Sequence, residues 1–135
     1  MVYITRRKQF NAAHKLYVEE WSQEKNFKVF GKCANPNWHG HNFILYVTVK
    51  GKPDPTTGMV MDFTRLGNIM KERVVNKLDH KNLNEDVDFM QGIQPTVENL
   101  AVAIWKELAP AIQDPNLHAV KIYETENNFV EYFGD

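Results

Sequence analysis

The side-chain periodicity of this chain changes twice, from the two-residue period of strands to the helical period of three and four, and back. Residues 2–10 mix β-forming and basic side chains, and residues 41–49 are rich in β-branched and aromatic ones, so both segments predict strands. Residues 51–58, GKPDPTTG, contain two prolines and two glycines and predict a loop that ends the second strand.

Two amphipathic helices are predicted after this loop. The first is capped by Asp62 and carries an apolar stripe at three- and four-residue steps, formed by Phe63, Leu66, Met70, Val74 and Leu78. The second is capped by Thr96 and ends before Pro110, and one of its faces is apolar: Val97, Leu100, Ala101, Ile104, Trp105 and Leu108.

Residues 118–125 and 128–132 predict two short strands, joined by a tight hairpin around Glu126 and Asn127. The order of elements is therefore ββααββ, which is an α+β fold class. A chain of 135 residues with 43% hydrophobic residues suits a single domain, which we expect to span residues 1–135.

Composition argues against two classes of partner. Sixteen basic and seventeen acidic residues give a formal net charge of -1, so no broad positive surface for nucleic acid is expected. No apolar run approaches the roughly 20 residues that cross a bilayer, and the first ten residues lack the apolar core of a signal peptide. We therefore expect a cytoplasmic protein with no membrane partner.

His39 and His41 are separated only by Gly40, and alternate side chains of an extended chain project to the same side. Two imidazoles can therefore converge, and His14, at the end of the first strand, could supply a third nitrogen. Three neutral imidazoles leave a fourth position open for water or substrate, as in catalytic zinc sites. The alternative is a set of ordinary polar or core histidines, which is the commoner origin of an isolated His-x-His pair.

Cys33 is the only cysteine, so it cannot form an internal disulfide. It lies in residues 31–37, a segment whose glycine, asparagines and proline predict a polar loop. Near zinc and a basic residue such as Lys32, its thiolate would be favoured, and it could act as a base or a nucleophile. A buried, structural thiol is the alternative.

Two acidic positions also have functional and structural interpretations. Asp79 and His80 follow the first helix and can orient or share a proton, although a histidine at a helix end is favourable in itself. Glu124 shares strand parity with Val120 and Ile122, so it falls on an apolar face and needs a partner. Paired N–H donors of a nitrogen heterocycle would suit this carboxylate, and a salt bridge at a strand end is the alternative.

Six segments, in order along the chain, closely resemble the successive signatures of the 6-pyruvoyl-tetrahydropterin synthase family: FNAAHKL, GKCANPNWHGHN, DPTTGMVMDF, LDHKNLN, PTVENLA and YETENN. The resemblance implies a zinc site formed by His14, His39 and His41, a proton-transfer triad of Cys33, Asp79 and His80, a pterin anchor at Glu124, and a pterin-pocket segment that contains Thr96. Pro95 and Trp38 depart from the family pattern, because threonine or serine is frequent at the first position and glycine is familiar at the second in the animal enzymes. We therefore expect a different pocket entrance.

The implied architecture is the tunnelling fold, in which a four-stranded antiparallel sheet carries two helices on one face. Three such chains close into a barrel and two trimers stack into a hexamer, which removes the open sheet edges. The implied reaction is the zinc-dependent conversion of 7,8-dihydroneopterin triphosphate to 6-pyruvoyl-tetrahydropterin with loss of triphosphate, a lyase step of tetrahydrobiopterin biosynthesis. The reaction is an internal rearrangement, so neither nicotinamide nor flavin is expected.

Two other functions fit parts of this pattern. The related 6-carboxy-tetrahydropterin synthase of queuosine biosynthesis uses the same substrate and releases acetaldehyde, but the five residues between Cys33 and His39 resemble the spacing of the pyruvoyl enzymes. A non-catalytic pterin- or metal-binding module would be expected to lack the thiol or the Asp79–His80 pair. Both features are present, which favours an enzyme.

Overall fold

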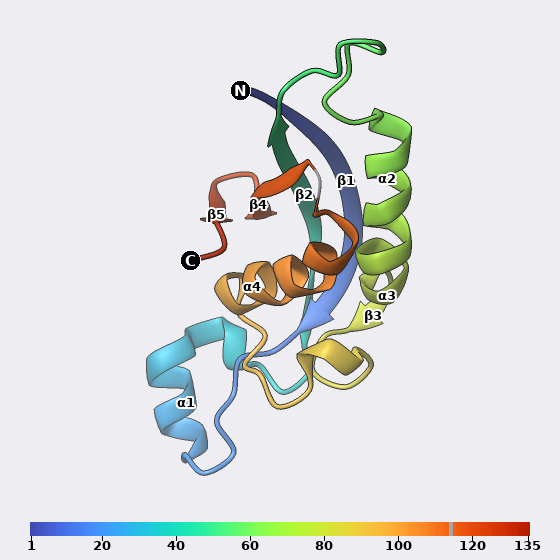
Figure 1. The fold of residues 1–135 in the computed structure, drawn as a ribbon. Helices are drawn as coiled ribbons and strands as arrows, with labels where there is room; N and C mark the ends of the chain where they lie inside the picture. The colour runs from blue at the N-terminus through green and yellow to red at the C-terminus, as the bar shows by residue number, and fades with distance from the viewer. Residues whose placement is uncertain (114) are drawn as a thin grey trace.

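β1 (Val2–His14) and β2 (His39–Gly51) are the two long strands, and both extend beyond the segments that the sequence predicts. In the computed structural model, which describes residues 1–113 and 115–135, they form an antiparallel pair whose register places Val2 opposite Gly51 and His14 opposite His39 (Figure 1). The predicted strands, residues 2–10 and 41–49, are therefore too short. Backbone pairing between the two strands carries β structure through asparagine, alanine and histidine residues that give no strand signal themselves.

The four predicted strands form the antiparallel part of the sheet. β4 (Asn116–Thr125) pairs with β2, and β5 (Asn128–Tyr132) pairs with β4. A fifth strand, β3 (Lys81–Asn82), lies parallel to β1 at the sheet edge and gives the order β3-β1-β2-β4-β5. β3 was not predicted from the sequence, because a strand of two residues is too short to show a period.

The first predicted helix is continuous but not uniform. It consists of α2 (Phe63–Met70), a π-helical turn over Lys71–Val75, and α3 (Asn76–Leu78), and the Asp62 carboxylate accepts the Thr64 N–H at 2.7 Å at its start. Its buried residues recur at steps of four, and at about 100° per residue each step overshoots a full turn by about 40°. The wider π turn offsets this drift and keeps the stripe against the sheet.

The predicted stripe of this helix needs one correction. Leu66, Met70, Val74 and Leu78 are fully buried, but Phe63 is 52% exposed. It stands at the first helical position, at the end of the stripe. Its carbonyl is tied to β1, because Arg6 Nη1 donates to it at 2.8 Å.

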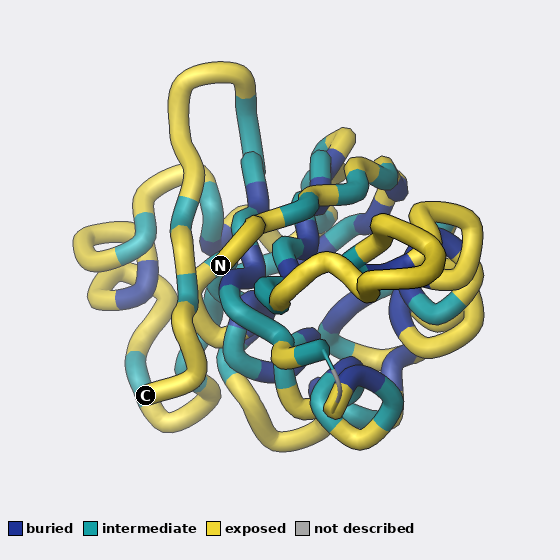
Figure 2. Tube along the Cα trace, turned by 45° about the horizontal axis from the view of Figure 1, so that its top comes forward, coloured by how far each residue is buried: buried dark blue, intermediate teal, exposed yellow. Residues whose placement is uncertain are grey.

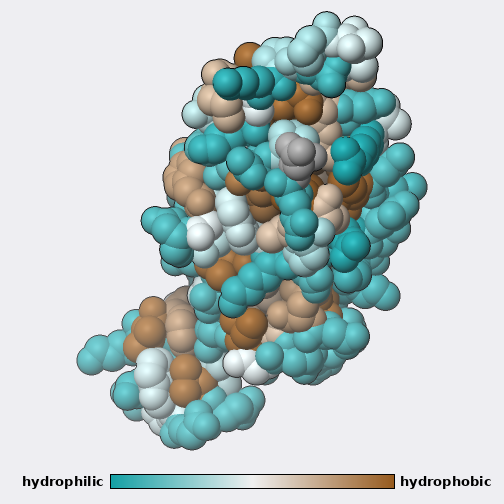
Figure 3. Space-filling view, viewed as in Figure 1, coloured by the Kyte–Doolittle hydropathy of each residue, from teal (hydrophilic) through white to brown (hydrophobic). Residues whose placement is uncertain are grey.

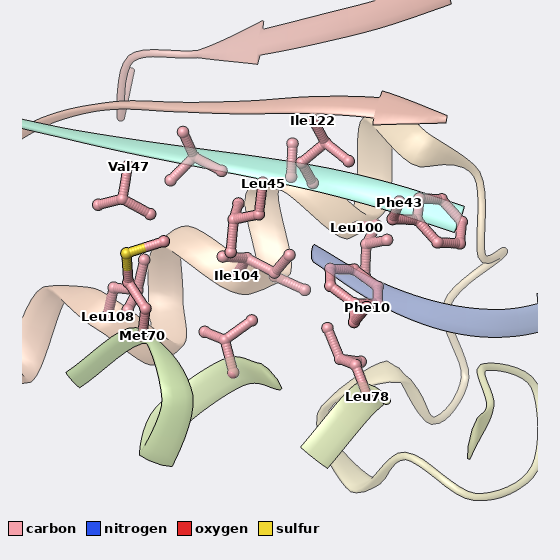
Figure 4. Close-up of a cluster of buried hydrophobic side chains, with 14 of the residues drawn as sticks. Phe10, Phe43, Leu45, Val47, Met70, Leu78, Leu100, Ile104, Leu108 and Ile122 are labelled. Atoms are coloured by element: carbon pink, nitrogen blue, oxygen red, sulfur yellow. The ribbon is translucent and has the colours of Figure 1, made fainter. Parts of the chain in front are cut away.

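The hydrophobic core lies between the sheet and the two predicted helices (Figure 4). α4 (Val97–Leu108) packs on β4 and β5, while α2 packs on β1. Phe43, Leu45 and Val47 of β2 face these helices, and Figure 2 shows the buried residues gathered inside the trace while loops and turns are exposed. The prediction of a sheet with both helices on one face is therefore confirmed.

A third helix, α1 (Gln23–Phe30), was not predicted, and it is followed by a 3-10 turn over Gly31–Ala34. The helix projects from the rest of the molecule in Figure 1, and in Figure 3 this projection shows apolar side chains among hydrophilic ones. The side chain of the buried Asn26 fixes it, because Oδ1 accepts the Val18 N–H at 2.7 Å and Nδ2 donates to the Val18 carbonyl at 3.0 Å. Cys33 thus lies in a helical turn instead of the polar loop that the sequence suggested.

Two further 3-10 turns, Asp88–Met90 and Ala109–Ala111, flank α4 in the sequence. None of the helices in the described ranges has both the length and the apolar character of a membrane span.

Candidate metal and substrate site

Three histidines converge where β1 ends and β2 begins. His14 and His39 are directly paired across the two strands, and His41 lies two residues further along β2 on the same face. One ring nitrogen from each of the three lies within 4.8 Å of the other two. His14 is buried and the other two are half-buried, so strand pairing gathers three donors at the edge of the core.

Four ring nitrogens of these histidines have no hydrogen-bond partner among the described residues. Nε2 of His14, both ring nitrogens of His39 and Nε2 of His41 are buried with no hydrogen bond from the described residues. Buried polar atoms of this kind are costly unless a ligand satisfies them. A cation that accepts nitrogen donors could bind one of these nitrogens from each of the three rings.

The orientation of His14 is set by Pro95. Its Nδ1 lies 2.8 Å from the buried Pro95 carbonyl, so Nδ1–H donates there and Nε2 is left as the free acceptor toward the other two rings. A backbone carbonyl that fixes the tautomer of a ligand in this way is common at metal sites. In the sequence, Pro95 stands out only as a departure from the family pattern, and no sequence signal identifies the contact that its carbonyl makes with His14.

Burial favours the neutral forms of His14 and His39. Desolvation lowers the pKa of His14 to about 4, against the hydrogen bond to Pro95, which raises it. The pKa of His39 is also lowered, first by burial and then by the nearby His41. Neutral imidazoles are the form that binds a metal.

Glu124 lies beside the histidines, although it is distant from them in sequence. Its Oε2 atom is 3.9 Å from Nε2 of His14, which confirms that this side chain points to the helix-covered face of the sheet. The half-buried carboxylate makes no other ion pair within the described part of the chain. It is therefore available to a ligand that reaches the histidines.

Cys33 belongs to the same cluster of groups. Its carbonyl accepts the Leu16 N–H at 2.8 Å, which ties the 3-10 turn to the residues that follow β1. Burial, and secondarily the negative charge of Glu124, raises the pKa of the thiol. The protein groups alone therefore do not favour the thiolate. Lys32, which was expected to help stabilise the thiolate, is exposed. An added cation would act in the opposite direction.

Asp79 and His80 form the pair that their adjacency predicts. His80 Nδ1 lies 3.0 Å from Asp79 Oδ2, and Asp79 Oδ1 accepts the Asn11 N–H at 2.8 Å. The bond from Asn11, followed by the contacts with His80, lowers the pKa of Asp79. His80 has a left-handed backbone, with a φ of 61°, and its own N–H donates to the Asn11 carbonyl.

The chain does not bring this pair to Cys33. Asp79 and His80 line a surface hollow with Gln9, Asn11 and Asn42. Gln9 and Asn11 alternate along β1 with Phe10 and Ala12, which are buried in the core, so the hollow opens on the sheet face opposite the helices. Within one chain the predicted proton-transfer triad is thus split between two places.

Thr96 has a clear structural role. Its Oγ1 accepts the Asn99 N–H at 3.1 Å and caps α4, as the sequence predicted. An N-cap of this kind is worth about 1 kcal/mol. Thr96 also follows Pro95 directly, so the cap fixes the segment that orients His14.

The fold is α+β, and three imidazole donors meet where two paired strands of its sheet adjoin. This arrangement defines a class of protein that can hold a metal ion. Comparison with known proteins then identifies its family. The chain belongs to the 6-pyruvoyl tetrahydropterin synthase family, which matches residues 3–135. The predicted family and the predicted tunnelling-fold class are therefore confirmed, and membership in this family of synthases indicates an enzyme.

The similar proteins cover the chain almost completely. A 6-pyruvoyl tetrahydrobiopterin synthase of Dictyostelium discoideum is 49% identical over 134 residues, which is 99% of this chain and 97% of the relative. The solved structure of the 6-pyruvoyl tetrahydropterin synthase of Caenorhabditis elegans is 39% identical, with a TM-score of 0.92, and covers 99% of this chain and 96% of that chain. A 6-carboxy-5,6,7,8-tetrahydropterin synthase of Rickettsia typhi is more distant, at 29% identity over 97% of this chain and 99% of the relative.

Proposed function

We propose that this protein, as one domain over residues 1–135, converts 7,8-dihydroneopterin triphosphate to 6-pyruvoyl-tetrahydropterin with release of triphosphate. The observation that carries the proposal is the group of unpartnered ring nitrogens on His14, His39 and His41, with the Glu124 carboxylate beside them. The high identity to relatives that bear the name of this synthase supports the same reaction.

We propose zinc as the metal, bound by His14, His39 and His41. Three neutral nitrogen donors with a further position left open are typical of catalytic zinc, and the free nitrogens fit this arrangement. A bound zinc ion supplies Lewis-acid polarisation of substrate oxygens.

The protein groups around this centre would bind and position the pterin. Glu124 would accept two parallel N–H bonds from the edge of the pterin ring, a pairing that an ionised carboxylate makes well. Its position 3.9 Å from His14 would place the pterin side chain at the metal centre. Cys33, on the same side of the sheet, would take a proton from the substrate side chain.

Asp79 and His80 would complete the site of a neighbouring subunit. They line a hollow on the sheet face opposite the helices, and β1 forms part of this hollow. Cys33 of the same chain does not line it. A trimer that closes the sheets into a barrel would bring such residues to the next chain, and two trimers would form the hexamer of the family. The open sheet edges in the isolated chain favour this assembly.

Removal and return of the metal tests the proposed function. Protein stripped by a chelator should release no triphosphate from dihydroneopterin triphosphate, and one zinc per subunit should restore the release. Mass photometry on the same samples should show six chains per particle. Full triphosphate release by the stripped protein would contradict the metal assignment.

A further inference from the structure

Residues 15–18 follow β1 directly but belong to none of the strands of the sheet. All four are half-buried, so their backbone N–H and carbonyl groups are partly shielded from water and need partners. In a sheet, a neighbouring strand would supply these partners. Here three side-chain amides supply them for three of the residues, because one amide carries both an acceptor and a donor.

Two of the amides pair with Lys15 and Tyr17. Asn84 Oδ1 accepts the Lys15 N–H at 3.0 Å, and Asn84 Nδ2 donates to the Lys15 carbonyl at 3.0 Å. Gln94 pairs with Tyr17 in the same way, since its Oε1 accepts the Tyr17 N–H at 3.1 Å and its Nε2 donates to the Tyr17 carbonyl at 3.0 Å. Alternate residues of an extended segment direct their backbone groups to the same edge. Asn84 and Gln94 therefore hold one edge of residues 15–18.

The other edge of residues 15–18 bonds to α1 and to the 3-10 turn that follows it. The Leu16 N–H donates to the Cys33 carbonyl at 2.8 Å. Val18 pairs through its N–H and its carbonyl with Asn26 of α1, which is the third amide. The segment thus connects Cys33, on one side, with Asn84 and Gln94 on the other.

The bond from Leu16 bears on the candidate site, because Cys33 lies beside that site in space. The negative charge of Glu124 is close enough to raise the pKa of the Cys33 thiol, and Glu124 Oε2 is 3.9 Å from His14 Nε2. Proton transfer depends on close approach of the groups that exchange the proton, and a displacement of about 1 Å can cost about 10²-fold in rate. Whatever holds the backbone of Cys33 therefore matters for its reaction.

We propose that Asn84 and Gln94 are positioning residues for Cys33. By pairing with Lys15 and Tyr17, they keep the N–H of the residue between these two directed at the Cys33 carbonyl. They thereby hold the thiol where it would take a proton from the substrate side chain. This inference rests on the proposed function, because proton transfer by Cys33 is a step of that reaction.

Gln94→Met and Asn84→Leu test the inference, because each keeps the approximate size of the side chain and removes the amide. Two variants are needed, since Gln94 precedes Pro95, whose carbonyl orients His14. Zinc content is therefore measured on both. If Gln94→Met alone loses zinc, Asn84→Leu decides the outcome.

Gln91→Met is the matched control. Gln91 Nε2 also donates to backbone carbonyls, those of Glu85 and Val87, each at 3.3 Å. It makes no hydrogen bond to residues 15–18, all of which the structure describes. The control thus removes an amide of the same type from the same stretch of chain without touching the segment that holds Cys33.

The measurements are kcat and KM for dihydroneopterin triphosphate, zinc content, and hydrogen exchange of residues 15–18 in the zinc-loaded protein. Gln94→Met and Asn84→Leu should each lower kcat by about tenfold with unchanged KM and zinc, and exchange at Leu16 should become faster. Gln94→Glu, which keeps the acceptor for the Tyr17 N–H, should restore part of the loss. Gln91→Met should match wild type.

The same substitutions in a Cys33→Ala background separate positioning from a general structural role. If Asn84 and Gln94 act through the thiol, neither substitution should lower kcat further once the thiol is absent. An equal loss of kcat in both backgrounds would overturn the inference. Wild-type kcat in both variants, or loss of zinc from both, would also overturn it.

Failure of the inference is distinct from failure of the proposed function. Triphosphate release by the wild-type protein, together with any of the contradicting results above, would leave the proposed function standing and remove only the positioning role. Absence of release by the zinc-loaded wild-type protein would contradict the proposed function, and the inference with it.

Discussion

Nε2 of His14 and Oε2 of Glu124 lie 3.9 Å apart. One residue stands at the end of β1 and the other near the end of β4, and β2 lies between these strands in the sheet. A ligand held by the Glu124 carboxylate is therefore next to a nitrogen that is free to bind a metal. This contact brings together the proposed pterin anchor and a proposed metal ligand, which lie far apart in the sequence.

His39→Ala should sharply reduce zinc binding, because it removes one of the three proposed protein ligands. The measurement is zinc per subunit by elemental analysis after dialysis against a mild chelator. His118→Ala is the matched control, since His118 contacts Tyr3 and Phe133 and lies outside the histidine cluster. Full zinc occupancy in His39→Ala would show that the ligand assignment is wrong.

Cys33→Ala should keep the fold and the zinc but lower turnover by about 10²- to 10⁴-fold, the usual contribution of a positioned proton-transfer group. The side chain is small and half-buried, so its truncation leaves little space unfilled. Triphosphate release and the Kd of dihydroneopterin should be measured on the same preparation. Near-native turnover would show that the thiol is not catalytic.

Glu124→Gln should weaken pterin binding more than it lowers the turnover rate of bound substrate. The variant keeps the shape of the side chain but puts a donor where a pterin N–H needs an acceptor, at a cost of about 1–3 kcal/mol. Calorimetry with dihydroneopterin measures this loss, and the zinc content must be checked because His14 is adjacent. Unchanged affinity together with a collapse of turnover would make Glu124 a catalytic group instead of an anchor.

Asp79→Asn should show a stability difference that depends on pH. The Asn11 N–H, and then His80, hold the pKa of Asp79 below the ordinary value of 3.8. The charged form therefore stabilises the folded state above that value, and the stabilisation is lost as the pH falls through the folded-state pKa.

Urea unfolding of wild type and Asp79→Asn at several pH values measures this effect. The free energy of unfolding of the variant should be lower near neutral pH, and the two proteins should converge in acid. A difference that stays constant down to pH values below 3.8 would contradict the role of the charge.

Local patterns were sufficient to predict the elements that have a clear period. The α4 stripe and the caps at Asp62 and Thr96 follow from residues near one another in sequence, and the structure confirms them. The same holds for strand parity, which places His39 and His41 on one face and turns Glu124 toward the core. These properties depend on neighbours two to four residues away.

Other features depend on contacts between distant segments. β1 reaches His14 because β2 pairs with it, and His14 is oriented by a carbonyl of Pro95. The separation of Asp79 from Cys33 depends on which sheet face each one reaches. α1 was missed because its buried residue is the polar Asn26, while Phe27 and Val29 are exposed, so the segment has no buried apolar stripe.

Identification of the reaction product tests the central claim most directly. Zinc-loaded protein should be incubated with 7,8-dihydroneopterin triphosphate under reducing conditions, and the pterin product should be analysed by mass spectrometry together with an assay for acetaldehyde. We predict 6-pyruvoyl-tetrahydropterin, an equal amount of triphosphate and no acetaldehyde. 6-Carboxy-tetrahydropterin with an equal amount of acetaldehyde would contradict the account.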